Sequence, residues 1–165
     1  MTIRNPPRRM LRAFLWVIGG LVLLVGLLLL VVPTLDGPHG RLVANEAAAV
    51  GTLRAVVTLE DAYTTSHAMT GFACELPLLT PIGKLRFPDY SWDFLTTGER
   101  AGYRFSLTGC VPDENQARAR YQITAAPMAP RKTGIRAFCA DQAGVIWYDL
   151  EGSAANCLSS RRLLE

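Results

Sequence analysis

The chain has 165 residues and a mass of 18.0 kDa, 50% of its residues are hydrophobic, and its mean hydropathy is +0.19. An ordinary soluble domain of this size is less apolar on average. The excess comes from one uncharged stretch, residues 13–35. Without it about 130 residues remain, enough for one domain that buries roughly two thirds of its unfolded surface. Two large domains are therefore excluded.

Charge is distributed unevenly along the chain. All 14 acidic residues lie at or after Asp36, whereas four of the 17 basic residues lie before the apolar stretch, namely Arg4, Arg8, Arg9 and Arg12. The charges of the other 13 basic residues are nearly balanced by those of the 14 acidic residues, so the net charge of +3 comes from the arginine cluster. A basic face for nucleic acid is not indicated, and we expect no nucleic-acid partner.

The apolar stretch predicts a single membrane span. As a helix, residues 13–35 would extend ~34 Å, which matches a hydrocarbon core of ~30 Å. The arginines before it place residues 1–12 in the cytoplasm and residues 36–165 outside it. The alternative is a cleaved signal peptide, but residues 31–35 (VVPTL) offer no Ala-x-Ala site. We therefore predict an uncleaved signal-anchor that contacts lipid of the inner (cytoplasmic) membrane, with a periplasmic or extracellular domain.

A second helix is predicted for residues 42–66. Residues of its apolar stripe recur at spacings of four and three: Leu42, Glu46, Ala49, Leu53, Val56, Glu60 and Tyr63. This period indicates an amphipathic helix with one packed face. Between the two helices, Pro33, Gly37, Pro38 and Gly40 predict a connector in which a continuous helix is not expected.

The carboxy-terminal half changes to the period of β-strands. After Gly71 we expect a proline-rich loop with a short helical turn near residues 92–95. Alternating patterns then predict strands within the following ranges: 103–108, 121–124, 135–140 and 145–150. The link 141–144 (DQAG) has the length of a tight hairpin. The fold class is therefore α+β, with the helix covering an antiparallel β-meander.

The four cysteines all lie on the predicted outer side of the membrane. Cys74, Cys110, Cys139 and Cys157 are an even number in an oxidising compartment, which indicates two structural disulfides. No pair has Cys-x-x-Cys spacing, and His39 and His67 lie too far away in sequence to suggest a zinc motif. Motifs of hydrolases, zinc proteases and nucleotide-binding proteins are missing from the sequence. We predict no catalytic, cofactor-binding or metal-binding residues, no cofactor, and no enzymatic activity.

Several polar and aromatic residues allow two interpretations. Glu46 and Glu60, at the edge of the helical stripe, are either functional or structural, and in the second case they are solvated or satisfy nearby loop amides. The adjacent acids Glu60 and Asp61, like those at residues 113–114, are expected to be solvated. Trp92 and Trp147 are interpreted as core or interface aromatics rather than a ligand cage.

Three segments resemble a known family. They are residues 45–54 (NEAAAVGTLR) with 60–63 (EDAY), residues 98–105 (GERAGYRF), and residues 136–146 (RAFCADQAGVI). In this order and spacing they resemble the type IV pilin-like proteins, including pseudopilins, over residues 33–158. The resemblance implies a pilin headpiece, in which an amphipathic helix packs on an antiparallel sheet and disulfides lie in the terminal region.

The resemblance does not extend to the amino-terminal segment. Pilins carry a cleavage site followed by a glutamate within the apolar segment, and this chain has no acidic residue before Asp36. The prepilin cleavage motif is therefore lacking, and we expect the arginine-bearing terminus to stay intact. Among three possible pairings we expect Cys74–Cys110 and Cys139–Cys157, because the second pair brackets the final hairpin.

Two functions follow as expectations. The first is a membrane-anchored, non-enzymatic pilin-like domain with a structural or interaction role, with protein partners in the cell envelope or in a pilus or secretion apparatus. The second is an extracytoplasmic ligand-binding or sensing module. A pocket with convergent polar groups beside Trp92 or Trp147 would favour the second function, and an exposed apolar strip would favour the first.

Overall fold

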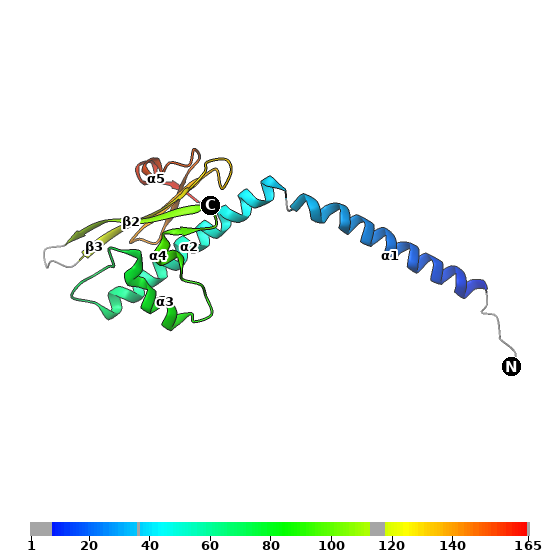
Figure 1. Cartoon of the computed structure of the whole chain (residues 1–165), viewed down its shortest axis with the longest axis horizontal. Coiled ribbons are helices and arrows are strands. Elements are labelled where there is room, and N and C mark those ends of the chain that lie inside the picture. Colours follow the sequence, from blue (N-terminus) through cyan, green and yellow to red (C-terminus); the bar gives the residue numbers. More distant parts are fainter. Residues whose placement is uncertain (1–7, 36, 113–117, 165) are drawn as a thin grey trace. The chain divides into compact units, whose positions relative to one another are not determined.

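The computed structural model describes residues 8–35, 37–112 and 118–164, which divide into two compact units, Met1–Gly40 and Arg41–Glu165 (Figure 1). The first unit contains the helix α1, Arg8–Leu35. Every side chain of Phe14–Leu28 is exposed, and nearly all of them are apolar. A long helix that shows apolar side chains on all faces requires a partner or a lipid environment to cover it.

The helix α2, Pro38–Ser66, confirms the predicted second helix and begins four residues before the predicted start at residue 42. The expected connector is shorter than predicted, because Pro33 lies within α1 while Pro38 and Gly40 lie within α2. The physical reason at Pro38 is that the first helical turn needs no amide donor, so proline is accepted there.

The buried face of α2 forms one side of the core. Its side chains Ala49, Leu53, Val56, Leu59 and Tyr63 join a single buried cluster with residues of the strands. Among the described residues, one helix is long and apolar enough to cross a membrane by length and composition, His39–Ser66, and 33% of its apolar stretch is buried in the domain. Because that buried part packs against the sheet, we assign α2 to the core of the domain. Phe14–Leu28 is a shorter apolar helix.

The strands form one six-stranded sheet in which each strand pairs antiparallel with the next along the chain. The strands are β1 (Glu99–Arg100), β2 (Tyr103–Pro112), β3 (Arg118–Pro127), β4 (Ala137–Asp141), β5 (Ile146–Asp149) and β6 (Arg162–Leu163). This order confirms the α+β fold with an antiparallel meander. The two-residue strands β1 and β6 were not predicted, because so short a segment shows no alternation.

The two faces of the sheet are covered by different elements. Tyr103, Tyr121 and Phe138 face α2 in the main core. On the opposite face, the helix α5, Ala154–Ser160, covers a small cluster of Cys139, Trp147, Cys157 and Leu158. Figure 1 shows α2 and α5 on the two sides of the sheet. The sequence did not predict α5, whose seven residues are too few for a period, although Ser153 caps it by accepting the amide of Asn156.

The proline-rich segment after Gly71 is more ordered than predicted. It contains a 3₁₀ helix η1, Leu76–Leu79, the helix α3, Thr80–Arg86, and the helix α4, Phe94–Thr97. The expectation of a loop was therefore wrong for residues 76–86. Proline stands in the first turn of both η1 and α3, where it favours a helix start.

Both predicted disulfides are present. Cys74 bonds Cys110 with a Cα–Cα distance of 5.8 Å, and Cys139 bonds Cys157 with one of 6.0 Å. The hairpin between β4 and β5 is also confirmed: the amide of Gly144 donates to the carbonyl of Asp141, and Gly144 has a φ of +71°. Only glycine adopts that conformation freely.

Candidate functional site

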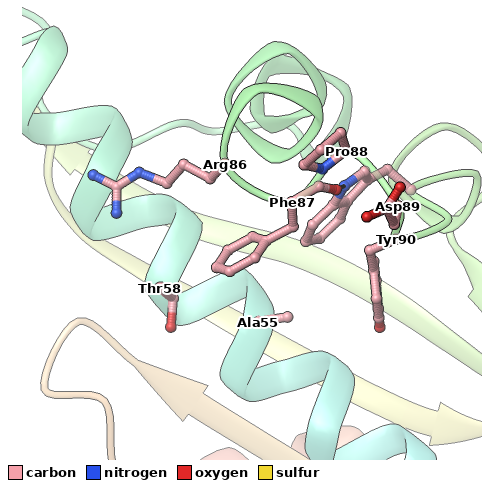
Figure 2. A pocket seen from close by; sticks show the side chains of 8 residues that line it. Ala55, Thr58, Arg86, Phe87, Pro88, Asp89 and Tyr90 are labelled. Carbon is pink, nitrogen blue, oxygen red and sulfur yellow. Dashed lines mark hydrogen bonds between the residues drawn. The ribbon is translucent and has the colours of Figure 1, made fainter.

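One hollow of the described domain lies beside Trp92. We call it the aromatic groove, and it has a volume of about 600 Å³. Its lining residues come from α2, from the last residue of α3 and from the segment that follows α3: Ala55, Thr58, Arg86, Phe87, Pro88, Asp89, Tyr90 and Trp92. Figure 2 shows the rings of Phe87 and Tyr90 extending toward α2, with Ala55 between them on the helix. The groove thus has aromatic walls on a helical floor.

Close packing under Trp92 fixes the walls of the groove. A Cβ added to Gly83 of α3 would lie 2.8 Å from the indole carbon Cδ2 of Trp92, so only glycine allows this approach. The indole Nε1 of Trp92 donates to the carbonyl oxygen of Phe87 at 3.1 Å. The guanidinium of Arg100 lies 4.5 Å from the centre of the Tyr90 ring. The ring of Trp92 is therefore held with its polar atom already satisfied.

The chemistry of the groove is apolar. The two rings at its walls are accessible: Phe87 is 48% exposed and Tyr90 36%. The charged side chains of Arg86 and Asp89 extend away from the space between the two rings, on opposite sides (Figure 2). Polar groups therefore do not converge in the groove, and its surface suits an apolar or aromatic group.

Glu46 satisfies amides of the loop before β4, which was one of the expected alternatives. Its Oε1 accepts hydrogen bonds from the amides of Ile135 at 2.9 Å and Arg136 at 3.1 Å, and its Oε2 accepts from Nε of Arg136 at 2.8 Å. Burial would raise the pKa of this carboxyl, but these hydrogen bonds and the positive charge of Arg136 outweigh it and lower the pKa. Glu46 thus links α2 to the entry of β4 through an ion pair and hydrogen bonds.

Glu60 also accepts a hydrogen bond from a loop amide, and the expectation that its carboxyl is solvated was wrong. It is 0% exposed rather than solvated, and its Oε2 accepts the amide of Ala73 at 2.8 Å. Its Oε1 is buried and has no hydrogen-bond partner in the described residues. Burial raises the pKa of Glu60 to about 7, against the opposing effect of the Ala73 amide. Asp61 is exposed as expected, and the acids at residues 113–114 lie outside the described residues.

The structure places the remaining sequence candidates apart from one another. Trp92 and Trp147 are 5% and 7% exposed and belong to separate clusters on opposite faces of the sheet, which supports their interpretation as core aromatics. His67 stacks on Tyr63 just after α2, and His39 lies at the start of α2. In the parts of the chain that the structure describes, no group of three His, Cys, Asp or Glu side chains could hold a metal ion.

Sequence reasoning missed the groove residues Phe87 and Tyr90. Their segment, residues 86–92 (RFPDYSW), has an aromatic residue at three of seven positions in a predicted loop. Three aromatic residues in so short a loop were a usable signal of a binding surface. It also missed Arg136 and Arg162, whose guanidinium groups both lie near the ring of Tyr148. Comparisons of this chain with protein-family models, curated proteins and solved structures give no match.

Proposed function

We propose that this chain is a membrane-anchored, non-enzymatic pilin-like protein with a structural or interaction role in the bacterial cell envelope, or in a pilus or secretion apparatus. The observation that carries the proposal is the pair of successive helices. An apolar helix with exposed side chains, α1, precedes a helix that packs its buried face on an antiparallel sheet. The first helix, α1, is suited to a lipid bilayer, and the second, α2, to the core of a folded domain.

The proposed location is the inner (cytoplasmic) membrane, with the amino terminus in the cytoplasm and residues 36–165 in the periplasm or outside. The four arginines before residue 13 favour this orientation. The two disulfides favour an oxidising compartment for the domain. Residues 13–35 then contact membrane lipid as an uncleaved signal-anchor.

The pilin-like assignment is supported by where the resembling segments lie. Residues 45–54 lie on the packed part of α2, residues 98–105 enter β2, and residues 136–146 form the β4–β5 hairpin. Each segment therefore occupies the kind of element that the resemblance implies. The Cys139–Cys157 disulfide likewise lies in the terminal region.

The experiment combines fractionation with protease accessibility. The full chain should stay in the membrane after alkaline carbonate washing, because a helix that crosses the bilayer is not released by pH or salt. Protease added to spheroplasts should digest residues 36–165 and spare the arginine segment. Release by carbonate would contradict the anchor, and digestion only after lysis would contradict the orientation.

A second candidate function, ligand binding, is favoured by the aromatic groove. Its volume of about 600 Å³ lies within the range of small-molecule sites, and its walls are aromatic. Because polar groups do not converge there, the ligand would be an apolar or aromatic molecule. The same groove would equally accept an apolar side chain of a protein partner.

Photo-crosslinking separates these two occupants. A photoreactive residue at Phe87, which lines the groove and is 48% exposed, should form an adduct in membranes of living cells. An adduct with the mass of a protein supports the interaction role, and one with the mass of a small molecule supports ligand binding. The matched control is the same residue at Leu150, which is 52% exposed on another part of the domain. Equal adducts at both positions would contradict a role for the groove.

A further inference from the structure

The connection from β3 to β4 combines exposed apolar and exposed basic side chains. We call residues 128–135 (MAPRKTGI) the basic loop. Met128 is 46% exposed and Ile135 42%, and Arg131 and Lys132 between them are exposed as well. Apolar side chains that enter the interface and basic side chains that attract anionic headgroups are the two contributions on which peripheral membrane contacts depend.

Hydrogen bonds within the basic loop fix its backbone. The amides of Lys132 and Thr133 both donate to the carbonyl oxygen of Ala129, at 3.0 and 2.9 Å. The amide of Ala129 donates to Oγ1 of Thr133 at 3.1 Å, and the amide of Arg131 donates to the carbonyl oxygen of Gly134 at 2.7 Å. The exposed side chains therefore stand on an ordered backbone, and binding through them costs little further backbone entropy.

Two side chains of α2 hold the basic loop at the amino-terminal part of that helix. Nδ2 of Asn45 donates to the carbonyl oxygen of Thr133 at 2.8 Å. Oε1 of the neighbouring Glu46 accepts the amide of Ile135 at 2.9 Å. The position of the loop is thus set by the first turns of α2.

The length of the chain keeps these first turns near the end of the apolar helix α1. From Leu35, the last residue of α1, to Pro38 the chain spans at most about 11 Å, even when fully extended. From Pro38 to Asn45 it is helical and extends ~10 Å more. Asn45 therefore lies within about 21 Å of Leu35. If residues 13–35 cross the membrane, as proposed above, the basic loop is within reach of the lipid headgroups.

The charge of the basic loop itself is positive. The loop contains no acidic residue, and neither Arg131 nor Lys132 forms an ion pair with a residue that the structure describes. One helical turn before Asn45 on α2, Arg41 is exposed and adds a third basic side chain.

Three acids belong to the elements packed against the basic loop: Glu46 of α2, Asp149 at the end of β5, and Glu151 in the turn that follows. The charge of Glu46 is balanced by its ion pair with Arg136. Oδ2 of Asp149 already accepts two amides of the same turn. Three basic side chains thus exceed the two remaining carboxylates, and the excess suits an anionic surface.

We propose that the basic loop binds the surface of an anionic lipid bilayer, with Met128 and Ile135 at the interface and Arg131 and Lys132 on the headgroup phosphates. The proposal rests on the proposed membrane anchor. Two basic side chains alone bind such a surface weakly. A covalent anchor makes the second contact intramolecular, so that even a weak contact is occupied. The orientation of the domain then depends on the charge of the lipid.

The two lysines of the chain provide a matched pair of reporters. Lys132 lies in the basic loop and Lys84 on α3, and both are exposed. The full chain is placed in nanodiscs of phosphatidylglycerol or of phosphatidylcholine and treated with a water-soluble acylating reagent, and peptide mapping gives the rate at each lysine. Relative to Lys84, we expect Lys132 to react about fivefold more slowly in phosphatidylglycerol, because headgroup contact shields its amine.

Paired variants test the side chains that make the contact. Arg131→Gln with Ile135→Ser removes one charge and one apolar group, both exposed, and should bring the rate at Lys132 to within twofold of its value in phosphatidylcholine. The matched control is Arg120→Gln with Val145→Ser, which changes an exposed arginine and an exposed apolar residue at the other end of the sheet. The control should keep Lys132 protected.

Equal rates at Lys132 in the two lipids would overturn the proposal, as would protection that survives Arg131→Gln with Ile135→Ser. Protection in native membranes but not in phosphatidylglycerol nanodiscs would mean that a protein covers the loop, and would also overturn it. Release of the chain by carbonate would contradict the anchor alone. In that case phosphatidylglycerol vesicles are added in excess to the released chain: protection of Lys132 supports the lipid contact of the loop, and its absence overturns it.

Discussion

Glu46 and Arg136 are 90 residues apart in the sequence, and Nη2 of Arg136 lies 2.7 Å from Oε2 of Glu46. The contact joins the amino-terminal part of α2 to the entry of β4. Three donors of one loop converge on a single carboxylate: two backbone amides and the guanidinium. Its lowered pKa means that this stabilisation is present above the unfolded pKa of the carboxyl and is lost as the pH falls.

Replacing Glu46 should destabilise the domain in two measurable steps. Glu46→Gln keeps an acceptor for the amides but loses the ion pair, and should lower the free energy of unfolding by about 1–2 kcal/mol. Glu46→Ala also leaves both amides without an acceptor, and should cost about 2–4 kcal/mol. Urea unfolding of the full chain in nonionic detergent measures both values.

The control is the exposed pair of Glu99 and Arg104, whose contact of 2.8 Å is equally short. Their side chains are 41% and 66% exposed, so Glu99→Gln should change stability by less than about 0.5 kcal/mol. Equal effects at Glu46 and Glu99 would show that the buried contact of Glu46 adds no more stability than a surface ion pair does.

The buried carboxyl of Glu60 should make the stability of the domain depend on pH. Its folded pKa of about 7 exceeds the ordinary value of 4.5, so the native state binds the proton more tightly than the unfolded chain. The contribution is complete below pH 4.5 and is lost as the pH rises to about 7. The free energy of unfolding should fall over this window by on the order of 3 kcal/mol from this group.

Glu60→Gln should remove that part of the slope, because an amide does not titrate. The comparison is made by urea unfolding at pH values across the window, with Glu75→Gln as the control, since Glu75 is an exposed glutamate. A slope unchanged by Glu60→Gln would mean that Glu60 does not carry the buried proton.

The regular spacing of apolar residues was enough to predict the longer helix and strands of the domain. The stripe from Ala49 to Tyr63 became the buried face of α2, and the alternation around Tyr103 and Tyr121 became β2 and β3. These segments are long enough for one face to repeat several times. The helices η1, α3 and α5 are one or two turns long, so tertiary packing and capping decide them rather than a repeating pattern.

Two arrangements could not be predicted from the same patterns. The aromatic groove depends on Gly83 allowing Trp92 to approach α3, a contact between residues nine positions apart. The approach of Arg136 and Arg162 to the ring of Tyr148 depends on the strand order that sets β6 beside β5. Such contacts follow from three-dimensional pairing, which the sequence of a single chain does not specify by spacing.

Gly134 should tolerate no side chain. A Cβ at this position would overlap the hydroxyl and ring of Tyr103, which is fully buried and donates its hydroxyl hydrogen to the carbonyl oxygen of Arg136 at 2.8 Å. Gly134→Ala should therefore lower the free energy of unfolding by about 2–4 kcal/mol. Gly51→Ala is the control, because its Cβ meets nothing within 4 Å, and it should raise helix stability by about 0.5–1 kcal/mol. Similar losses in both variants would contradict the packing argument.

The two disulfides should differ in their susceptibility to reduction of the folded protein. Cys139 and Cys157 are 0% exposed and join α5 to β4, whereas Cys74 and Cys110 are half-buried. A thiolate must reach a sulfur atom to attack it, so a mild reductant should open Cys74–Cys110 first. Cys139–Cys157 should open only when the domain unfolds. Alkylation of the released thiols followed by peptide mapping at successive times measures the order.

Each disulfide should also stabilise the domain, because it closes a loop and so lowers the entropy of the unfolded chain. The sequence separations are 36 and 18 residues, so loss of Cys74–Cys110 should cost up to about 4 kcal/mol and loss of Cys139–Cys157 up to about 3 kcal/mol on the chain-entropy estimate. The variants Cys74→Ala with Cys110→Ala, and Cys139→Ala with Cys157→Ala, test this by urea unfolding. The second pair also lines the cluster around Trp147, so its loss should additionally loosen α5 and increase amide exchange there. Simultaneous release of all four thiols from the folded chain would contradict the proposed difference in access.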